Sequence, residues 1–171
     1  MTRPLSGGPV SVPGASVPPV TESAGHDAVA LSDDQLPGAE EALDLYDSVG
    51  WVAYTRHPDV LARALAGSTT VVTARRGGRL VGLARAISDG ATICYLQDIL
   101  VRPEEHRTGV GRALVERVLD RHADVRQRVL VTDAEPGQRA FYESLGFTEL
   151  HEVGSGDGED GLRGFISWAQ G

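Results

Sequence analysis

The sequence has little cysteine, few aromatic residues and no long apolar run. Cys94 is its single cysteine among 171 residues, which excludes an internal disulfide framework and indicates a reducing compartment. No apolar run reaches the length of a signal-peptide core or a membrane span. Sixteen Lys and Arg against 24 Asp and Glu give a formal net charge of −8, which argues against a nucleic-acid surface and against anchoring on an anionic membrane. We therefore expect a cytoplasmic protein.

Two parts of the chain differ in composition. Residues 1–26 consist largely of Pro, Gly, Ser, Thr and Val, a composition that cannot bury much apolar surface and predicts a disordered N-terminal tail. Residues 27–171 contain the periodic apolar segments. They are numerous enough to bury a core, so we expect one domain there.

Hydrophobic periodicity and turn residues predict the order of helices and strands in that domain. Arg75-Arg76-Gly77-Gly78 is a strong hairpin signal between two β-rich runs. The expected strands are residues 28–31, 69–74, 80–87, 91–101 and 129–132, followed by a closing hairpin of residues 147–153 and 162–168. The expected helices are residues 40–49 and 59–66, joined by the aromatic connector 51–55, then one running to about His122 and one from Pro136 to Leu145 with Gly146 as its C′ residue.

The stretch from His106 to Arg112, His-Arg-Thr-Gly-Val-Gly-Arg, joins the expected strand 91–101 to the helix that follows. A glycine-containing loop at a helix N-terminus leaves backbone N–H groups free to bind phosphate, and glycines let the ligand approach the backbone. The P-loop reading fails because Arg112 and Ala113 follow Gly111, where that motif needs Lys and then Ser or Thr. The dinucleotide fingerprint also fits poorly, because Leu114 stands where its third glycine belongs.

Two segments together resemble the GNAT superfamily of N-acetyltransferases. His106-x-x-Gly109-x-Gly111 is similar to its acyl-CoA loop, Q/R-x-x-G-x-G/A, with His in place of Gln or Arg, and Ala140 to Phe147 (AFYESLGF) is similar to its FYxxLGF motif. The resemblance covers roughly residues 28–168. It implies an α/β (α+β) fold with a mixed, mostly antiparallel sheet of six to seven strands flanked by about four helices. One departure is that Asp133, Glu135 and Gln138 stand where the family has Asn or Ala.

The resemblance also implies a cosubstrate, acetyl-CoA, and no metal. Backbone groups are expected to hold it, from the strand residues Ile99, Leu100 and Val101 and from the loop residues Arg107, Thr108, Gly109, Val110, Gly111 and Arg112. Tyr142, in the second motif, is the expected proton donor to the departing thiolate, because a phenol with a pKa of about 10 stays protonated at neutral pH. The alternative is that Tyr142 only packs the last helix against the sheet.

The acceptor side is less defined. Leu96-Gln97-Asp98 resembles the Leu-Glu-Asp segment of polyamine-type family members, where the Glu position assists removal of the amine proton. Gln97 cannot act as a base, so Asp98 could act directly, through water, by attracting a cationic amine, or only as a structural carboxylate. Trp51 and Tyr54 are expected to contact the acceptor together with Gln97; the alternative is that these two aromatic residues only cap the core.

The expected function is transfer of an acetyl group from acetyl-CoA to a primary amine of a small molecule or protein, by direct attack in a ternary complex. Carboxylates on the first helix, joined by Asp98, predict a preference for small basic amines; they are Glu40, Glu41, Asp44 and Asp47. The alternative function is a catalytically silent acyl-CoA-binding module. A homodimer is compatible with either reading, and the fold does not select the acceptor.

Overall fold

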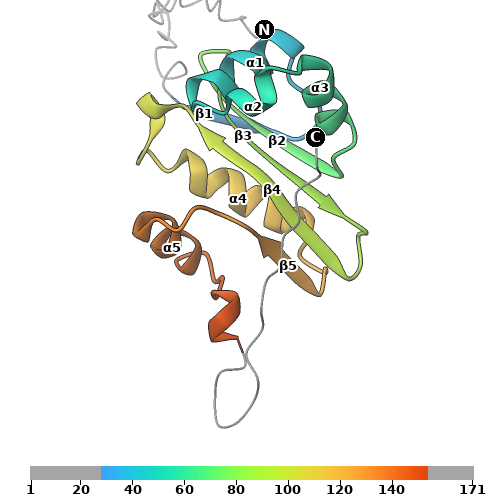
Figure 1. Ribbon diagram of the computed structural model, residues 1–171, viewed down its shortest axis with the longest axis vertical. Coiled ribbons are helices and arrows are strands. Elements are labelled where there is room, and N and C mark those ends of the chain that lie inside the picture. The colour runs from blue at the N-terminus through green and yellow to red at the C-terminus, as the bar shows by residue number, and fades with distance from the viewer. Residues whose placement is uncertain (1–27, 154–171) are drawn as a thin grey trace, which may run out of the picture.

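The computed structural model describes residues 28–153, so the expected tail, 1–26, and the expected strand 162–168 lie outside the described residues. One mixed sheet carries helices on both faces (Figure 1). Its helices are α1 (Ala39–Ser48), α2 (Val52–Thr55), α3 (Pro58–Ala66), α4 (Val110–Arg121) and α5 (Pro136–Glu143). Its strands are β1 (Val29–Ser32), β2 (Thr70–Arg76), β3 (Arg79–Ser88), β4 (Ile93–Val101) and β5 (Gln127–Leu130).

The strands lie in the order β1-β2-β3-β4-β5, and all neighbours are antiparallel except the parallel pair β4–β5. This confirms the expected mixed, mostly antiparallel α/β fold. The β2–β3 turn consists of Gly77 and Gly78, at φ 55° and 83°, which is the left-handed backbone that a tight hairpin requires.

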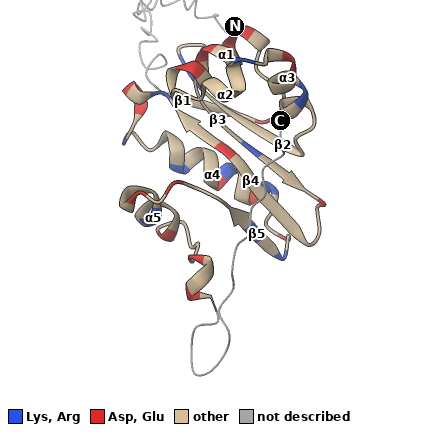
Figure 2. Cartoon of the chain, viewed as in Figure 1, with Lys and Arg blue, Asp and Glu red and all other residues tan. Residues whose placement is uncertain are grey.

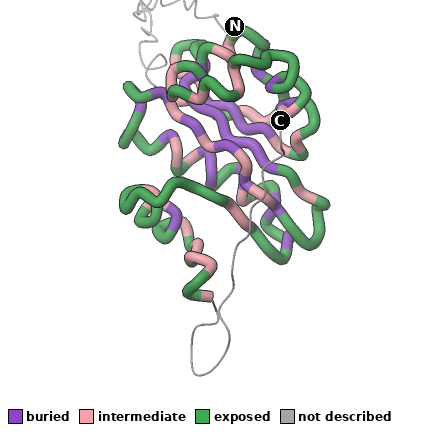
Figure 3. Tube along the Cα trace, in the orientation of Figure 1, coloured by how far each residue is buried: buried purple, intermediate pink, exposed green. Residues whose placement is uncertain are grey.

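Two apolar cores cover the two faces of the sheet. On one face, residues of β2, β3 and β4 such as Val72, Ala84 and Leu96 pack with Leu114 and Val118 of α4. Contact with α4 is close: a Cβ on Gly82 would stand 2.9 Å from the Leu114 side chain. The other face packs against α1 and α3, through residues that include Leu45, Tyr46, Leu61, Leu83 and Leu100. Figure 3 shows the buried residues concentrated along the central strands.

A β-bulge at Gln97 changes which face each half of β4 presents. Arg85 of β3 pairs with Asp98, whereas the next residue, Ala86, pairs with Leu96, so Gln97 has no partner on β3. Without the extra residue, Leu96 and Asp98 would point to the same face. With it, Leu96 lies in the α4 core, while Leu100 lies in the core under α1 and α3.

Helix α5 ends as the sequence predicts, with Gly146 in the C′ position at φ 86°. The Phe147 N–H donates to the Tyr142 carbonyl at 3.1 Å, and that of Gly146 donates to Glu143 at 3.0 Å. These two bonds and the ring contact between Tyr142 and Phe147 make a Schellman motif.

The expected strand at 147–153 is wrong, because Leu150–Glu152 is a 3₁₀ turn. Phe147, Leu150 and Val153 recur every third residue, which is the period of a 3₁₀ turn and not the alternation of a strand. The aromatic connector also contains the short helix α2, which was not expected. No helix within residues 28–153 is long and apolar enough to cross a membrane.

Candidate active site

The outer edge of β4 is paired along only half of its length. Strand β5 pairs with β4 from Ile93 to Leu96 and then diverges. Beyond the bulge at Gln97, no described strand pairs with this edge of residues 98–101. The two strands thus separate about halfway along β4 and leave a length of its backbone without a neighbouring strand.

The register shows which amides face this free edge. The Arg102 N–H donates to the Val81 carbonyl of β3 at 2.9 Å. Because backbone groups alternate in direction along an antiparallel pair, the amides of Ile99 and Val101 then point away from β3, and that of Leu100 points toward it. Ile99, Leu100 and Val101 were expected to hold the cosubstrate through their N–H groups. The N–H of Leu100 is turned to β3 and does not face the free edge, whereas those of Ile99 and Val101 do.

His106 marks the end of the free edge. Its Nε2 lies 2.9 Å from the carbonyl oxygen of Val101, and because a carbonyl only accepts, the ring nitrogen is the donor. The contact ties the glycine loop directly to the end of β4. The sequence reading gave this histidine no role of its own.

The glycine loop leads straight into α4. Gly109 is the N-cap at φ 92°, a left-handed conformation, and no side chain caps the first turn of α4. The amides of Val110, Gly111 and Arg112 in that turn therefore have no capping acceptor among the described side chains. A Cβ on Gly111 would meet Val101 at 3.7 Å and Phe141 at 3.8 Å, so the loop lies between the end of β4 and helix α5.

A bidentate ion pair supports the start of the loop. Arg76 on the β2–β3 hairpin binds Glu105, with Nε to Oε1 at 2.8 Å and Nη2 to Oε2 at 3.0 Å. Glu105 is buried, and its hydrogen bonds with Arg76 lower the pKa of its carboxyl group. Its carbonyl accepts from the Thr108 hydroxyl at 2.7 Å. These bonds fix the loop before any ligand arrives.

Tyr142 is buried in α5 on the same side as the loop. Its ring makes edge contacts with Phe141 and Phe147, at centroid distances of 5.0 and 5.9 Å. Burial raises the pKa of the Tyr142 phenol, and a hydrogen bond with the Thr132 side chain opposes this in part. The hydroxyl is therefore protonated at neutral pH, as a proton donor requires.

On the face of the sheet that α1 and α3 cover, Asp98 lies at the centre of a buried polar network. Its side chain is ion-paired with Arg85 and accepts from the Tyr46 hydroxyl at 2.8 Å and the Tyr54 hydroxyl at 3.0 Å. Asp98 is 1% exposed and Arg85 is 6% exposed. Burial, followed by the charge of Asp98, raises the pKa of both tyrosines.

The expected acceptor residues come together around this network. Trp51 stacks on Tyr54 at 5.7 Å with an interplanar angle of 25°, and Gln97 Nε2 lies 3.5 Å from the Tyr54 hydroxyl. Sequence reasoning missed Arg85 and Tyr46. The one signal for Arg85 in the sequence was that it is a charged residue inside an otherwise apolar strand. Its partner on β4 could not be predicted from spacing.

Two of the four α1 carboxylates that were expected to form an acidic entrance are paired with arginines. Arg75 binds Glu41 with Nη1 at 2.6 Å and lowers the pKa of that carboxyl group to about 2. Arg102 pairs with Asp44, and Asp47 accepts from the Thr55 hydroxyl at 2.6 Å. Figure 2 shows acidic residues on α1 with basic residues nearby. Because Glu41 and Asp44 are neutralised in this way, they contribute little net negative charge.

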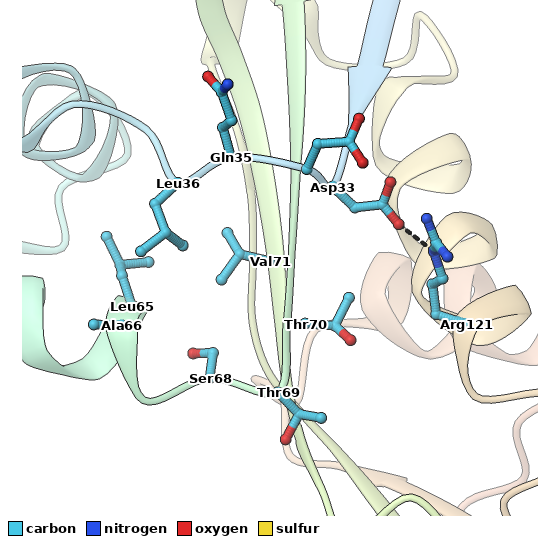
Figure 4. Close-up of a pocket in the computed structure, with 11 residues that line it drawn as sticks. Asp33, Gln35, Leu36, Leu65, Ala66, Ser68, Thr69, Thr70, Val71 and Arg121 are labelled. Carbon is cyan, nitrogen blue, oxygen red and sulfur yellow. Dashed lines mark hydrogen bonds and ion pairs between the residues drawn. The ribbon is translucent and has the colours of Figure 1, made fainter.

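A separate hollow of about 430 Å³ lies at the N-terminal end of β2 (Figure 4). Strand β1 reaches only as far as Thr73 of β2, so the edge of residues 70–72 is uncovered. Asp33 at its rim accepts from Arg117 at 3.0 Å and pairs with Arg121. Ser68, also at the rim, accepts from Arg85 at 3.3 Å, so this hollow touches the far side of the Asp98 network.

Within the part of the chain that the structure describes, Glu149, His151 and Glu152 bring potential metal-ligand atoms within 4.8 Å of one another. The sequence reading identified no such group. Arg139 pairs with Glu152 at 2.5 Å and with Glu149 at 3.7 Å. One arginine therefore already contacts both carboxylates.

Comparison with known proteins is consistent with this geometry. Residues 46–163 match the model of the acetyltransferase (GNAT) domain. An uncharacterised N-acetyltransferase of Pyropia yezoensis is 28% identical over 123 residues, 70% of either chain. The GCN5-related N-acetyltransferase 2 of Arabidopsis thaliana is 35% identical over 126 residues, 60% of this chain and 47% of the relative. A solved GNAT family structure from Streptococcus pneumoniae superposes with a TM-score of 0.70 and 27% identity, covering 84% of this chain and 100% of the other.

Proposed function

This chain belongs to the GNAT family of acetyltransferases, and from that premise we propose that it transfers the acetyl group of acetyl-CoA directly to a primary amine within a ternary complex. The observation that carries the proposal is the free edge of β4 ending at an uncapped glycine loop. An extended ligand arm can pair with the free edge of β4 while its phosphates bind the glycine loop. Residues 27–171 are proposed to form the domain that does this.

The residues present fit acetyl-CoA. Left-handed Gly109 and the small Gly111 let phosphate oxygens approach the loop backbone. Amides along Arg107 to Arg112 are proposed to bind the pyrophosphate, together with the positive end of the α4 dipole. The outward N–H groups of Ile99 and Val101 are proposed to align the arm and to polarise a carbonyl oxygen. When bound, the cosubstrate supplies a thioester whose carbonyl carbon accepts the amine.

Tyr142 is the proposed general acid. As the C–N bond forms and the C–S bond breaks, its phenol gives a proton to the departing sulfur. Its raised pKa keeps that proton in place at neutral pH. The adjacent residue Phe141 packs close to Gly111, so helix α5, which carries Tyr142, lies beside the loop that is proposed to bind the cosubstrate.

Asp98 is proposed to act as a positioning residue and not as the direct base. A base must contact the amine or a water molecule, but Asp98 is fully buried and its oxygens already bind Arg85, Tyr46 and Tyr54. Water is then the group that takes the amine proton. This choice selects one of the alternatives that the sequence left open.

The test is thiol release from acetyl-CoA in the presence of a panel of primary amines, with acetyl-CoA binding measured separately by calorimetry. Amine-dependent release of CoA is the expected result. Tight binding without release for any amine would instead indicate a silent acyl-CoA-binding module of the same fold.

A further inference from the structure

Two tyrosines bind the same carboxylate but differ in exposure. Tyr46 is 0% exposed and lies wholly inside the core. Tyr54 is only partly buried, and its hydroxyl lies beside Gln97 at the bulge. Tyr54 is therefore a partly exposed residue whose hydroxyl is anchored to Asp98 next to the bulge in β4.

The direction of its hydrogen bond decides what Tyr54 can offer. A phenol has one proton, and Tyr54 gives that proton to Asp98 Oδ1 at 3.0 Å. Asp98 cannot rotate away easily, because Arg85 and Tyr46 hold its other oxygen. The Tyr54 oxygen already accepts from Gln97 Nε2 at 3.5 Å, so its remaining lone pair is the acceptor for an incoming N–H donor.

We propose that Tyr54 is the residue that receives the acceptor, its phenol oxygen accepting a hydrogen bond from the N–H of a primary amine, while Asp98 and Arg85 position that oxygen. The inference rests on the proposed acetyl transfer and names the acceptor side of the same site. An amine that donates an N–H to Tyr54 keeps its own lone pair free to attack the thioester. The proton released on attack goes to water.

The charge balance defines the class of acceptor. Arg85 neutralises Asp98, and Arg75 and Arg102 neutralise Glu41 and Asp44, so these three carboxylates give the site little attraction for a polycation. Its wall consists of the stacked rings of Trp51 and Tyr54. The structure thus assigns a primary amine on an aromatic or apolar carbon skeleton, bound in its neutral form.

The matched pair Tyr54→Phe and Tyr46→Phe tests this role. Each variant removes one hydroxyl that binds Asp98 and keeps the ring. Tyr54→Phe should raise the KM for 2-phenylethylamine by about fivefold to tenfold, the loss typical of one hydrogen bond, with little change in kcat or in the Kd for acetyl-CoA. Tyr46→Phe should lower the melting temperature yet leave the amine KM within about twofold.

Three outcomes contradict the inference. An unchanged amine KM in Tyr54→Phe would show that the Tyr54 hydroxyl does not contact the amine. Equal increases of the amine KM in both variants would show that Tyr54 acts only as a structural partner of Asp98. A higher kcat/KM for spermidine than for 2-phenylethylamine in the wild-type protein overturns the proposed class of acceptor. Failure of the wild-type protein to release CoA with any amine is a different result, since it refutes the acetyl transfer itself.

Discussion

Arg85 and Asp98 form a buried ion pair across β3 and β4, at the residue pair where the register shifts around Gln97. A buried pair stabilises a protein only if its remaining polar atoms are also bonded, because desolvating two charges is costly. Here Tyr46 and Tyr54 bond the carboxylate and Ser68 accepts from the guanidinium. The pair therefore fixes the register of β3 and β4 at the bulge, where the free edge of β4 begins.

Breaking this pair from one side should be strongly destabilising. Arg85→Met leaves Asp98 buried without its counter-charge and should lower the free energy of unfolding by ~3–5 kcal/mol. Arg85→Met combined with Asp98→Asn should recover part of that loss, because no uncompensated charge remains. Urea unfolding of the two single variants and the double variant measures the coupling. Additive losses would show that the two side chains do not act as a pair.

Replacing Gly111 by alanine separates folding from ligand binding. Its Cβ would make ordinary contacts of 3.7 and 3.8 Å, so the melting temperature should hardly change, while acetyl-CoA affinity should fall about tenfold or more as phosphate oxygens lose their approach to the backbone. Gly137→Ala in α5 is the control, because its Cβ meets nothing within 4 Å. Wild-type affinity in Gly111→Ala, measured by calorimetry, would place the phosphate site elsewhere.

Tyr142→Phe should lower the rate of acetyl transfer by ~10²-fold with little change in the Kd for acetyl-CoA. Single-turnover kinetics is the appropriate measurement, because slow product release can hide a chemical step. The raised pKa of the phenol adds a pH signature: the acid form is lost only as pH rises above about 10, so Tyr142 should cause no decline between pH 7 and pH 9. An unchanged single-turnover rate in the variant would falsify its role as general acid.

Arg107 is the single non-glycine residue with positive φ in residues 28–153, at 63°. This conformation strains an L-residue by ~1–2 kcal/mol, which glycine avoids. Arg107→Gly should therefore be neutral or stabilising by up to ~1 kcal/mol after the greater chain entropy of glycine is allowed for. Arg117→Gly, in the interior of α4, should instead destabilise by ~1 kcal/mol or more, because it also loses a hydrogen bond to Asp33. Thermal melts of the two variants test this prediction. Equal losses of stability in both variants would contradict backbone strain at Arg107.

His122 should make the fold sensitive to mild acid. It is 5% exposed, with Nε2 3.0 Å from the Thr70 hydroxyl, and burial followed by the charge of Arg128 lowers its pKa. Since the pKa is lower in the folded than in the unfolded state, this contribution to stability is complete above about pH 6.5 and decreases as pH falls below that value. His122→Gln should flatten the dependence of melting temperature on pH between 7.5 and 5.5. A slope equal to that of the wild-type protein would assign the effect to other groups.

The sequence by itself determined the features that depend on local chemistry. Gly77-Gly78 predicted the β2–β3 hairpin, the loop from His106 to Gly111 predicted the strand-to-helix junction, and Gly146 predicted the end of α5. Each is a short-range signal, because φ preferences and capping act between residues close in the chain. Two such motifs were enough to identify the family.

Tertiary structure decided what each polar side chain bonds to. Spacing along β4 places Leu96 and Asp98 on one face, and only pairing with β3 reveals the bulge at Gln97 that separates them. Arg85 and Tyr46 lie 13 and 52 residues from Asp98 in sequence, and no local pattern connects groups so far apart. Whether Asp98 attracts a cation or is already neutralised depends on that long-range pairing, since the energy of a charge is set by its neighbours in space and by its burial.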